Sequence, residues 1–187
     1  IMLPLLKEVF MIGKVYSAAV TGIYAVPVEV QADVAPGIPY FELTGNLAGT
    51  TKEAKERVRI AIKNSKFQIN PSKITINMIP ANIRKEGTSY DLAVATAVLT
   101  AVGVIAAKKV SGALFIGELG LDGGICNVSS ILPMTLCARD NGFTICYVPM
   151  GNVGEASLVT GIRVIGISSL RECVCLLYTS PSPRDTR

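Results

Sequence analysis

The chain has 187 residues, half of them hydrophobic, and a formal net charge of +4 at pH 7. This length allows one substantial core but excludes a domain joined to a complete ATPase module. The mean hydropathy of +0.46 suggests a membrane segment. However, polar residues and a glycine interrupt the longest apolar run, residues 92–107, and it is shorter than the roughly 20 residues that span a bilayer. We therefore expect a buried helix and no membrane partner.

The hydrophobic pattern predicts an alternation of strands and helices. Polar and apolar residues alternate in 73–79, as in a half-buried strand. The other expected strands are 13–20, 24–34, 40–43, 113–119 and 144–148. The expected helices are 51–65, 89–105, 132–140, 153–158 and a short one starting at residue 169. Opening strands followed by alternating helices and strands indicate an α/β or α+β sandwich.

The helix expected at 51–65 has a basic face. The basic residues recur at three- and four-residue spacing and are Lys52, Lys55, Arg59, Lys63 and Lys66. The acidic Glu56 lies on the same face. The apolar face contains Ala54, Val58, Ala61 and Ile62 and is expected to contact the core. A basic stripe suits phosphate contact, so these residues are candidates for DNA binding. The alternative is a solvated face on which Lys52 and Glu56 form an ordinary i,i+4 pair.

The loop before this helix imitates a phosphate-binding loop. Residues 45–52 read Gly-Asn-Leu-Ala-Gly-Thr-Thr-Lys. A Walker A motif needs four residues between its glycines and ends in Gly-Lys-Ser/Thr, so that backbone amides and the lysine reach the phosphates. We therefore expect no ATP site, and no cofactor, in this chain.

Ser89 is the candidate nucleophile. It lies in the segment 84–91, between an expected strand and a long apolar helix, where free N–H groups favour an oxyanion. A serine needs a general base nearby, and the chain contains no histidine. The alternative gives this segment no chemistry: Thr88 or Ser89 caps the helix, with Asp91 in its first turn.

The cysteines indicate a reducing compartment and no metal site. Four of the five cysteines, Cys126, Cys137, Cys146 and Cys173, are widely spaced among apolar neighbours, and Cys175 belongs to the suspected C-terminal tail. The chain has no C-x-x-C motif and no histidine. We expect buried free thiols and a cytoplasmic location.

Five stretches carry a resemblance to a known family. They are residues 14–19, 52–59, 84–87, 117–123 and 131–133. In this order they resemble the Lon-protease-like superfamily and, within it, the N-terminal ChlI-type domain of magnesium-chelatase-like AAA+ ATPases of the competence-protein (ComM/YifB) type. The resemblance implies a Lon-protease-like, ribosomal protein S5 domain 2-like fold. The chain departs from the family at Ala54, usually serine, and at Asn46-Leu47, usually Leu-Pro.

The resemblance also implies a function. In Lon-type peptidases a lysine activates the serine that Ser89 matches, and that lysine would fall at about Leu132. We therefore expect a retained fold without peptidase chemistry, serving subunit assembly and DNA contact. The parent would be a hexameric ATPase ring for branch migration in DNA recombination, with ATP and Mg bound by its AAA+ module. The alternative is a Lon-like serine peptidase that uses Ser89 and a lysine from elsewhere.

Both ends of the chain look foreign to this domain. The resemblance begins at Met11, so residues 1–10 are interpreted as an upstream extension and 11–174 as the domain. Residues 175–187 resemble a translated sequencing adapter and are interpreted as an artefactual tail. A natural Ser/Pro-rich linker is the alternative. In either case we expect the natural protein to continue beyond Val174.

Overall fold

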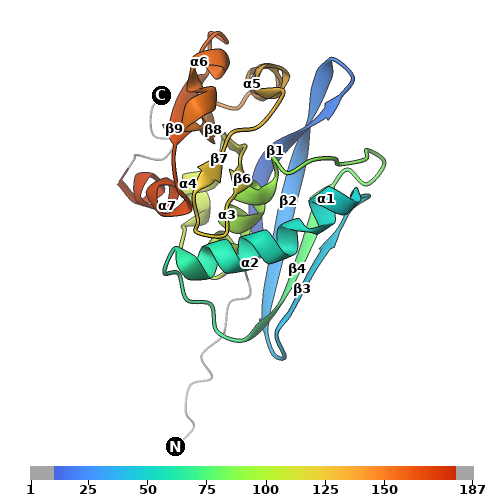
Figure 1. Cartoon of the computed structure of the whole chain (residues 1–187), viewed down its shortest axis with the longest axis vertical. Helices are drawn as coiled ribbons and strands as arrows, with labels where there is room; N and C mark the ends of the chain where they lie inside the picture. Colours follow the sequence, from blue (N-terminus) through green and yellow to red (C-terminus); the bar gives the residue numbers. More distant parts are fainter. Residues whose placement is uncertain (1–10, 180–187) are drawn as a thin grey trace, which may run out of the picture.

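The computed structural model describes residues 11–179, and the interpretations of residues 1–10 and 180–187 lie outside this range. Within it, a mixed sheet of seven strands has the order β3-β4-β2-β1-β5-β8-β9 (Figure 1). These strands are β1 Gly13–Thr21, β2 Tyr24–Pro36, β3 Tyr40–Thr44, β4 Ser72–Ile79, β5 Ala113–Phe115, β8 Ile145–Pro149 and β9 Arg163–Ile167. The predicted α/β fold class is confirmed.

The sheet combines an antiparallel part and a parallel part. β1 and β2 form a long antiparallel hairpin that pairs Gly13 with Ala32 and ends at Thr21 opposite Tyr24. β2 continues the antiparallel pairing with β4, whereas β5, β8 and β9 are parallel to their neighbours. Figure 1 shows the β1–β2 turn reaching the top of the view, beyond α2 and α3.

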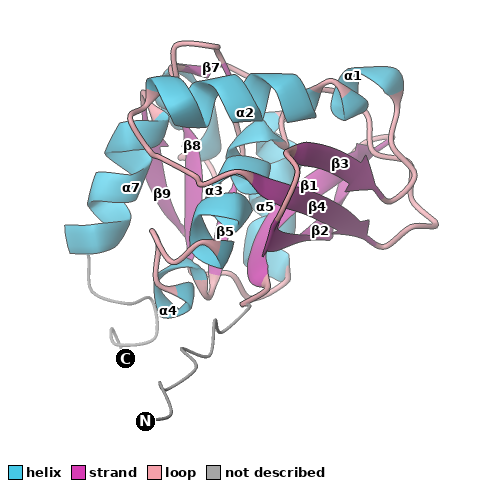
Figure 2. Ribbon diagram, turned by 90° about the horizontal axis from the view of Figure 1, so that it is seen from below, coloured by secondary structure: helices cyan, strands magenta, loops and turns pink. Residues whose placement is uncertain are grey.

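Helices cover both faces of the sheet. They are α1 Gly49–Lys52, α2 Ala54–Asn64, α3 Asp91–Ala101, α4 Ala107–Val110, α5 Ile131–Asp140, α6 Val153–Ala156 and α7 Leu170–Thr179. Alternate strand residues point to opposite faces, so Phe115 and Tyr147 join the core cluster of α2, α3 and α7, while Leu114 and Cys146 join that of α5 and α6. Figure 2 shows α2 above β3 and β4, and α7 beside β9.

The long apolar run forms the central helix, α3. Every residue from Leu92 to Thr100 is buried. The hydroxyls of Thr96 and Thr100 donate to the carbonyls four residues earlier, at 2.7 and 2.8 Å, so these buried polar groups are satisfied. In the part of the chain that the structure describes, no helix has the length and apolarity to cross a membrane.

Two of the differences between the expected and the observed elements are explained by glycines. The helix expected to reach residue 105 ends at Ala101, because Gly103 follows the C-cap with a φ of 79°. The strand expected over 113–119 divides into β5 and β6 Glu118–Leu119 at Gly117. There the Gly117 N–H donates to the Ser89 carbonyl at 2.9 Å, and its own carbonyl accepts from the Leu92 N–H at 3.0 Å. The strand end is therefore tied to the start of α3.

Other expectations were incomplete. The helix expected over 51–65 is interrupted at Glu53, between α1 and α2, and the one expected over 153–158 is the short α6. The strand β9, the helix α4 and the short strand β7 Ile125–Cys126 were not predicted. The helix α7 crosses the expected boundary at residue 174 and buries Leu177, and that boundary remains a prediction.

Candidate functional site

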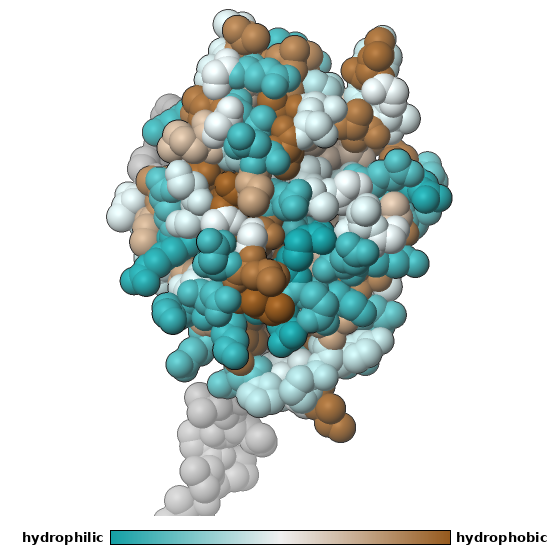
Figure 3. Space-filling view, in the orientation of Figure 1, coloured by the Kyte–Doolittle hydropathy of each residue, from teal (hydrophilic) through white to brown (hydrophobic). Residues whose placement is uncertain are grey.

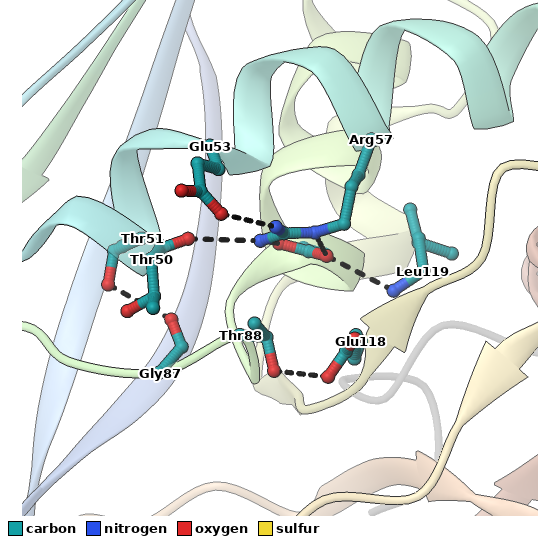
Figure 4. A network of polar contacts seen from close by, with 9 residues as sticks. Thr50, Thr51, Glu53, Arg57, Gly87, Thr88, Glu118 and Leu119 are labelled. Carbon is teal, nitrogen blue, oxygen red and sulfur yellow. Dashed lines mark hydrogen bonds and ion pairs between the residues drawn. The ribbon is translucent and has the colours of Figure 1, made fainter.

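The segment that contains Ser89 is fixed by the connection between β3 and α2. The Lys85 N–H donates to the Asn46 carbonyl at 3.0 Å, and the Ala48 N–H donates to the Lys85 carbonyl at 2.9 Å. The hydroxyl of Thr51 lies 3.1 Å from the Lys85 carbonyl oxygen. It also lies 3.0 Å from the carbonyl oxygen of Gly87 (Figure 4). Backbone and side-chain hydrogen bonds from residues 46–51 therefore hold residues 85–87 in place.

Lys85 is fully buried, which could not be expected from its neighbours in the sequence. Its Nζ donates to the carbonyls of Gly45 at 2.7 Å, Met78 at 3.3 Å and Pro80. Burial lowers the pKa of Lys85. The ammonium has three hydrogens, and these three carbonyls satisfy them, so Lys85 joins the end of β4 to the loop before α1. We therefore assign Lys85 a structural role and not a catalytic one.

A bidentate ion pair lies behind the segment. Arg57 on α2 donates from Nε to Asp91 Oδ2 at 2.7 Å and from Nη2 to Oδ1 at 3.1 Å. The Leu119 N–H also donates to Asp91, at 3.2 Å (Figure 4). Burial raises the pKa of Asp91, and the bonds from Arg57 and Leu119 oppose that rise. The hydrogen bond to Asp91 raises the pKa of Arg57.

Ser89 lines a pocket of about 480 Å³ at the N-terminus of α3. The pocket is lined by residues of β1, the 84–91 segment, β6, the segment between β7 and α5, and α5 itself. They are Val20, Glu86, Gly87, Thr88, Ser89, Tyr90, Glu118, Asn127, Val128, Ser129, Ser130 and Met134. The interpretation of Thr88 or Ser89 as a helix cap was wrong: Tyr90 is the N-cap, and no side chain caps the helix. The Thr88 hydroxyl donates to Glu118 instead, because that carboxylate lies within reach on β6.

No basic group lines this pocket. Its polar lining consists of hydroxyls, one amide and two carboxylates. Leu132, the expected position of a Lon-type lysine, is half-buried on the first turn of α5 and is not part of the lining. Lys108 and Lys109 lie on α4, which follows the C-terminal end of α3. The pocket can therefore bind donors and cations, but it has no amine or imidazole to activate Ser89.

The structure exposes all the predicted DNA-contact residues. Lys52 is on α1, Lys66 follows α2, and Lys55, Arg59 and Lys63 are on α2. Figure 3 shows mainly hydrophilic side chains over α2 in the view of Figure 1. The predicted core face of Ala54, Val58, Ala61 and Ile62 is buried, as expected.

The suggested pair of Lys52 with Glu56 was wrong. Glu56 Oε2 accepts from Arg59 Nη2 at 2.8 Å, because residues three apart on α2 share a face whereas Lys52 belongs to α1. Both partners are more than half exposed, so this pair adds little stability. The exposed Arg59 side chain can therefore still contact a binding partner.

Among the described residues, no group of three or more histidine, cysteine, aspartate or glutamate side chains is placed to hold a metal ion. Cys137, Cys146 and Cys173 are buried thiols, and burial raises the pKa of Cys137 to about 11 and that of Cys146 to about 12. Cys126 is exposed, against the expectation of a buried thiol, because it lies on β7 outside both core clusters. Free thiols with raised pKa values are poor nucleophiles and poor metal ligands.

Comparisons with known proteins agree with the resemblance in the sequence. Residues 30–152 match the family described as Subunit ChlI of Mg-chelatase. The chain is 36% identical to YifB of Escherichia coli over 147 residues, which are 79% of this chain and 29% of that protein. It is 35% identical to competence protein ComM of Haemophilus influenzae over 163 residues, 87% of this chain and 32% of that protein. A Lon protease of Malacoplasma penetrans is 28% identical over 147 residues, 75% of this chain and 19% of that protein.

The chain thus spans about a third of the length of the curated YifB and ComM relatives that it matches.

Proposed function

The chain belongs to the ChlI family of magnesium-chelatase-like proteins, and from this premise we propose that it is a non-catalytic assembly and DNA-contact domain of a ComM-type AAA+ ATPase. The family match covers the centre of the chain, from β2 to η1 Met150–Asn152.

The absence of a base from the Ser89 pocket carries the non-catalytic part of the proposal. A serine hydroxyl is a weak nucleophile unless a neighbouring group takes its proton. The residues that line this pocket offer only carboxylates for that task, and Glu118 already accepts the Thr88 hydroxyl. A carboxylate is a much weaker base than the amine of a Ser-Lys arrangement.

The basic face of α2 supports DNA contact. Its five lysine and arginine side chains are exposed and follow one helix and its two ends: Lys52, Lys55, Arg59, Lys63 and Lys66. Lysine and arginine side chains in such a row bind phosphates without reading sequence. The exposed Glu53 and Glu56 reduce the net charge of this region, so we expect weak, salt-sensitive binding to DNA.

A second candidate function is a serine peptidase. It is favoured by the position of Ser89, which is partly exposed in a pocket at the N-terminus of a buried helix. Ser129 and Ser130 lie across the same pocket. This function would require a lysine delivered from elsewhere, because no lysine lines the pocket.

The activity of the whole parent is also a proposal. We expect an AAA+ module that binds ATP and Mg, assembly into a hexameric ring, a cytoplasmic location and work in branch migration during DNA recombination. Sequencing the source DNA past the codon for Val174 tests this part. An in-frame Gly-x-x-x-x-Gly-Lys-Ser/Thr motif is expected, and its absence would remove the ATPase proposal.

Direct binding tests the DNA-contact part. Fluorescence anisotropy of a labelled duplex, titrated with this chain at low salt, should show binding that weakens steeply as salt is added. An anisotropy that stays flat at low salt would contradict a DNA-contact role for this domain.

A further inference from the structure

We propose that the pocket at the N-terminus of α3 is a binding site for a primary ammonium group. This proposal concerns a ligand of the pocket and does not depend on DNA contact by α2. It is carried by the charge of the lining, by its hydrogen-bond acceptors and by the rigidity of its walls.

The lining has an excess of negative charge. Its charged residues are Glu86 and Glu118, and it contains no lysine or arginine. Among the described residues, Glu118 forms no ion pair within 4.0 Å and only accepts the Thr88 hydroxyl. Glu86 pairs with Arg84 at 2.7 Å, but both side chains are about two-thirds exposed, so solvent screens the pair.

The start of α3 does not cancel this charge. A helix N-terminus carries roughly half a positive charge, and Asp91 lies in the first turn of α3. Asp91 is itself neutralised by Arg57. Arg84 accompanies Glu86, so Glu118 is the lining carboxylate without an ion pair among the described residues. One such carboxylate against roughly half a positive charge leaves the pocket negative, which favours a cation over an anion or an oxyanion.

The other lining groups suit an ammonium on an alkyl stem. An ammonium donates three hydrogen bonds and accepts none. Acceptors are supplied by the hydroxyls of Ser89, Ser129 and Ser130 and by the amide of Asn127, in addition to the carboxylates. Val20 and Met134 provide apolar surface for methylene groups. The volume of about 480 Å³ is of the size that small ligands occupy.

The walls of the pocket are held in place before any ligand binds. The buried Asn152 side chain accepts from the Val128 N–H at 2.9 Å and donates to the Val128 carbonyl at 3.0 Å. The opposite wall is held by the Gly117 N–H, which donates to the Ser89 carbonyl at 2.9 Å. A preorganised site loses little entropy on binding, so even a small cation can be retained.

Two sources present this chemistry: the side chain of a lysine in a peptide, and a free aliphatic diamine. The test uses the full chain, labelled with ¹⁵N. It is titrated with a capped Ala-Lys-Ala tripeptide, with the same tripeptide carrying norleucine in place of lysine, and with cadaverine. Norleucine keeps the apolar stem and removes the charge.

We expect the lysine tripeptide to shift the amide signals of Ser89, Asn127 and Ser130, and the norleucine tripeptide to leave them unchanged. Cadaverine shifts the same signals if free diamines are also accepted, and a response to the lysine tripeptide alone identifies a peptide side chain as the source. Absent shifts, or equal shifts with lysine and norleucine, would overturn the proposal.

Charge-removing variants add a second readout. Glu118→Gln keeps an acceptor for Thr88, and Glu86→Gln changes an exposed side chain, so both variants should fold. Each should weaken binding about tenfold, the loss expected for one charge-assisted hydrogen bond. The control is Glu155→Gln, which removes the same charge from an exposed position on α6 outside the lining. Equal weakening in all three variants would also contradict the proposal.

Discussion

Arg57 on α2 donates two hydrogen bonds to the carboxylate of Asp91 on α3, and the Asp91 side chain is only 1% exposed. This pair joins the helix that carries the basic face to the helix whose N-terminus forms the pocket. The residues are 34 positions apart in the sequence. This buried pair therefore helps to fix the relative placement of the two candidate sites, in addition to the apolar packing of α2 and α3 in one core cluster.

Replacing Arg57 by methionine should strongly destabilise the fold. The change leaves the buried Asp91 carboxylate with only the Leu119 N–H, and an unpaired buried charge costs about 3–5 kcal/mol. Urea unfolding measures the loss. Adding Asp91→Leu to Arg57→Met should recover part of it, because the orphaned charge is then gone.

The control for this prediction is Arg59→Met on the same helix. Arg59 pairs with Glu56 at the surface, where such a pair contributes less than about 1 kcal/mol. Equal losses for Arg57→Met and Arg59→Met would show that the buried pair has no special role.

Replacing Lys85 by methionine should also destabilise the chain, by about 1–3 kcal/mol, because the buried carbonyl of Met78 and the partly buried carbonyls of Gly45 and Pro80 lose their ammonium donor. Urea unfolding is again the measurement. Arg84→Met is the matched control, since Arg84 is two-thirds exposed and pairs only with its neighbour Glu86. If Lys85→Met were as stable as the wild type, the proposed structural role of Lys85 would be wrong.

Lys85 should also make stability depend on pH. Burial lowers its pKa in the folded chain below the ordinary value of 10.5. Between the lowered pKa and 10.5 the unfolded chain binds more protons than the folded chain, so the free energy of unfolding should rise with pH. The difference between wild type and Lys85→Met, measured by urea unfolding across alkaline pH, should therefore grow through this window. A difference that shrinks with rising pH would contradict the sign.

The sheet was largely predictable because its residues alternate. β1, β2 and β4 have polar and apolar residues in turn, and the structure places them within one or two residues of the expected bounds. The strand β9 was missed because it is short and contains Gly166, which weakens the strand pattern. The end of α3 carried a usable signal, since Gly103 is the type of residue that terminates helices.

The candidate site was only partly predictable. Ser89 was recognised as a candidate because it precedes a long apolar helix. The basic face was recognised from the helical spacing of its residues. The Arg57–Asp91 pair and the burial of Lys85 depend on contacts between segments far apart in the chain, and no local pattern reports such contacts. From its sequence neighbour Glu86 alone, Lys85 would be expected at the surface, whereas the fold buries it.

Ser89 should not react with a fluorophosphonate probe. Such probes label serines whose proton is taken by a nearby base, and none lines this pocket. Mass spectrometry of the wild type and Ser89→Ala after incubation should show no adduct in either, while trypsin in the same tube is labelled. A stoichiometric adduct on Ser89 would restore the peptidase candidate.

The salt dependence of DNA binding tests the central claim most directly. Anisotropy titrations with a labelled duplex at several salt concentrations give the slope of log K against log salt for the wild type, for Arg59→Ala with Lys63→Ala, and for Arg163→Ala with Arg171→Ala. The last variant removes the same charge from exposed sites outside α2. We expect the α2 variant to bind more weakly, with a slope shallower by about 0.9 for each lost phosphate contact, and the control to match the wild type. Unchanged affinity and slope in the α2 variant would contradict DNA contact through this helix.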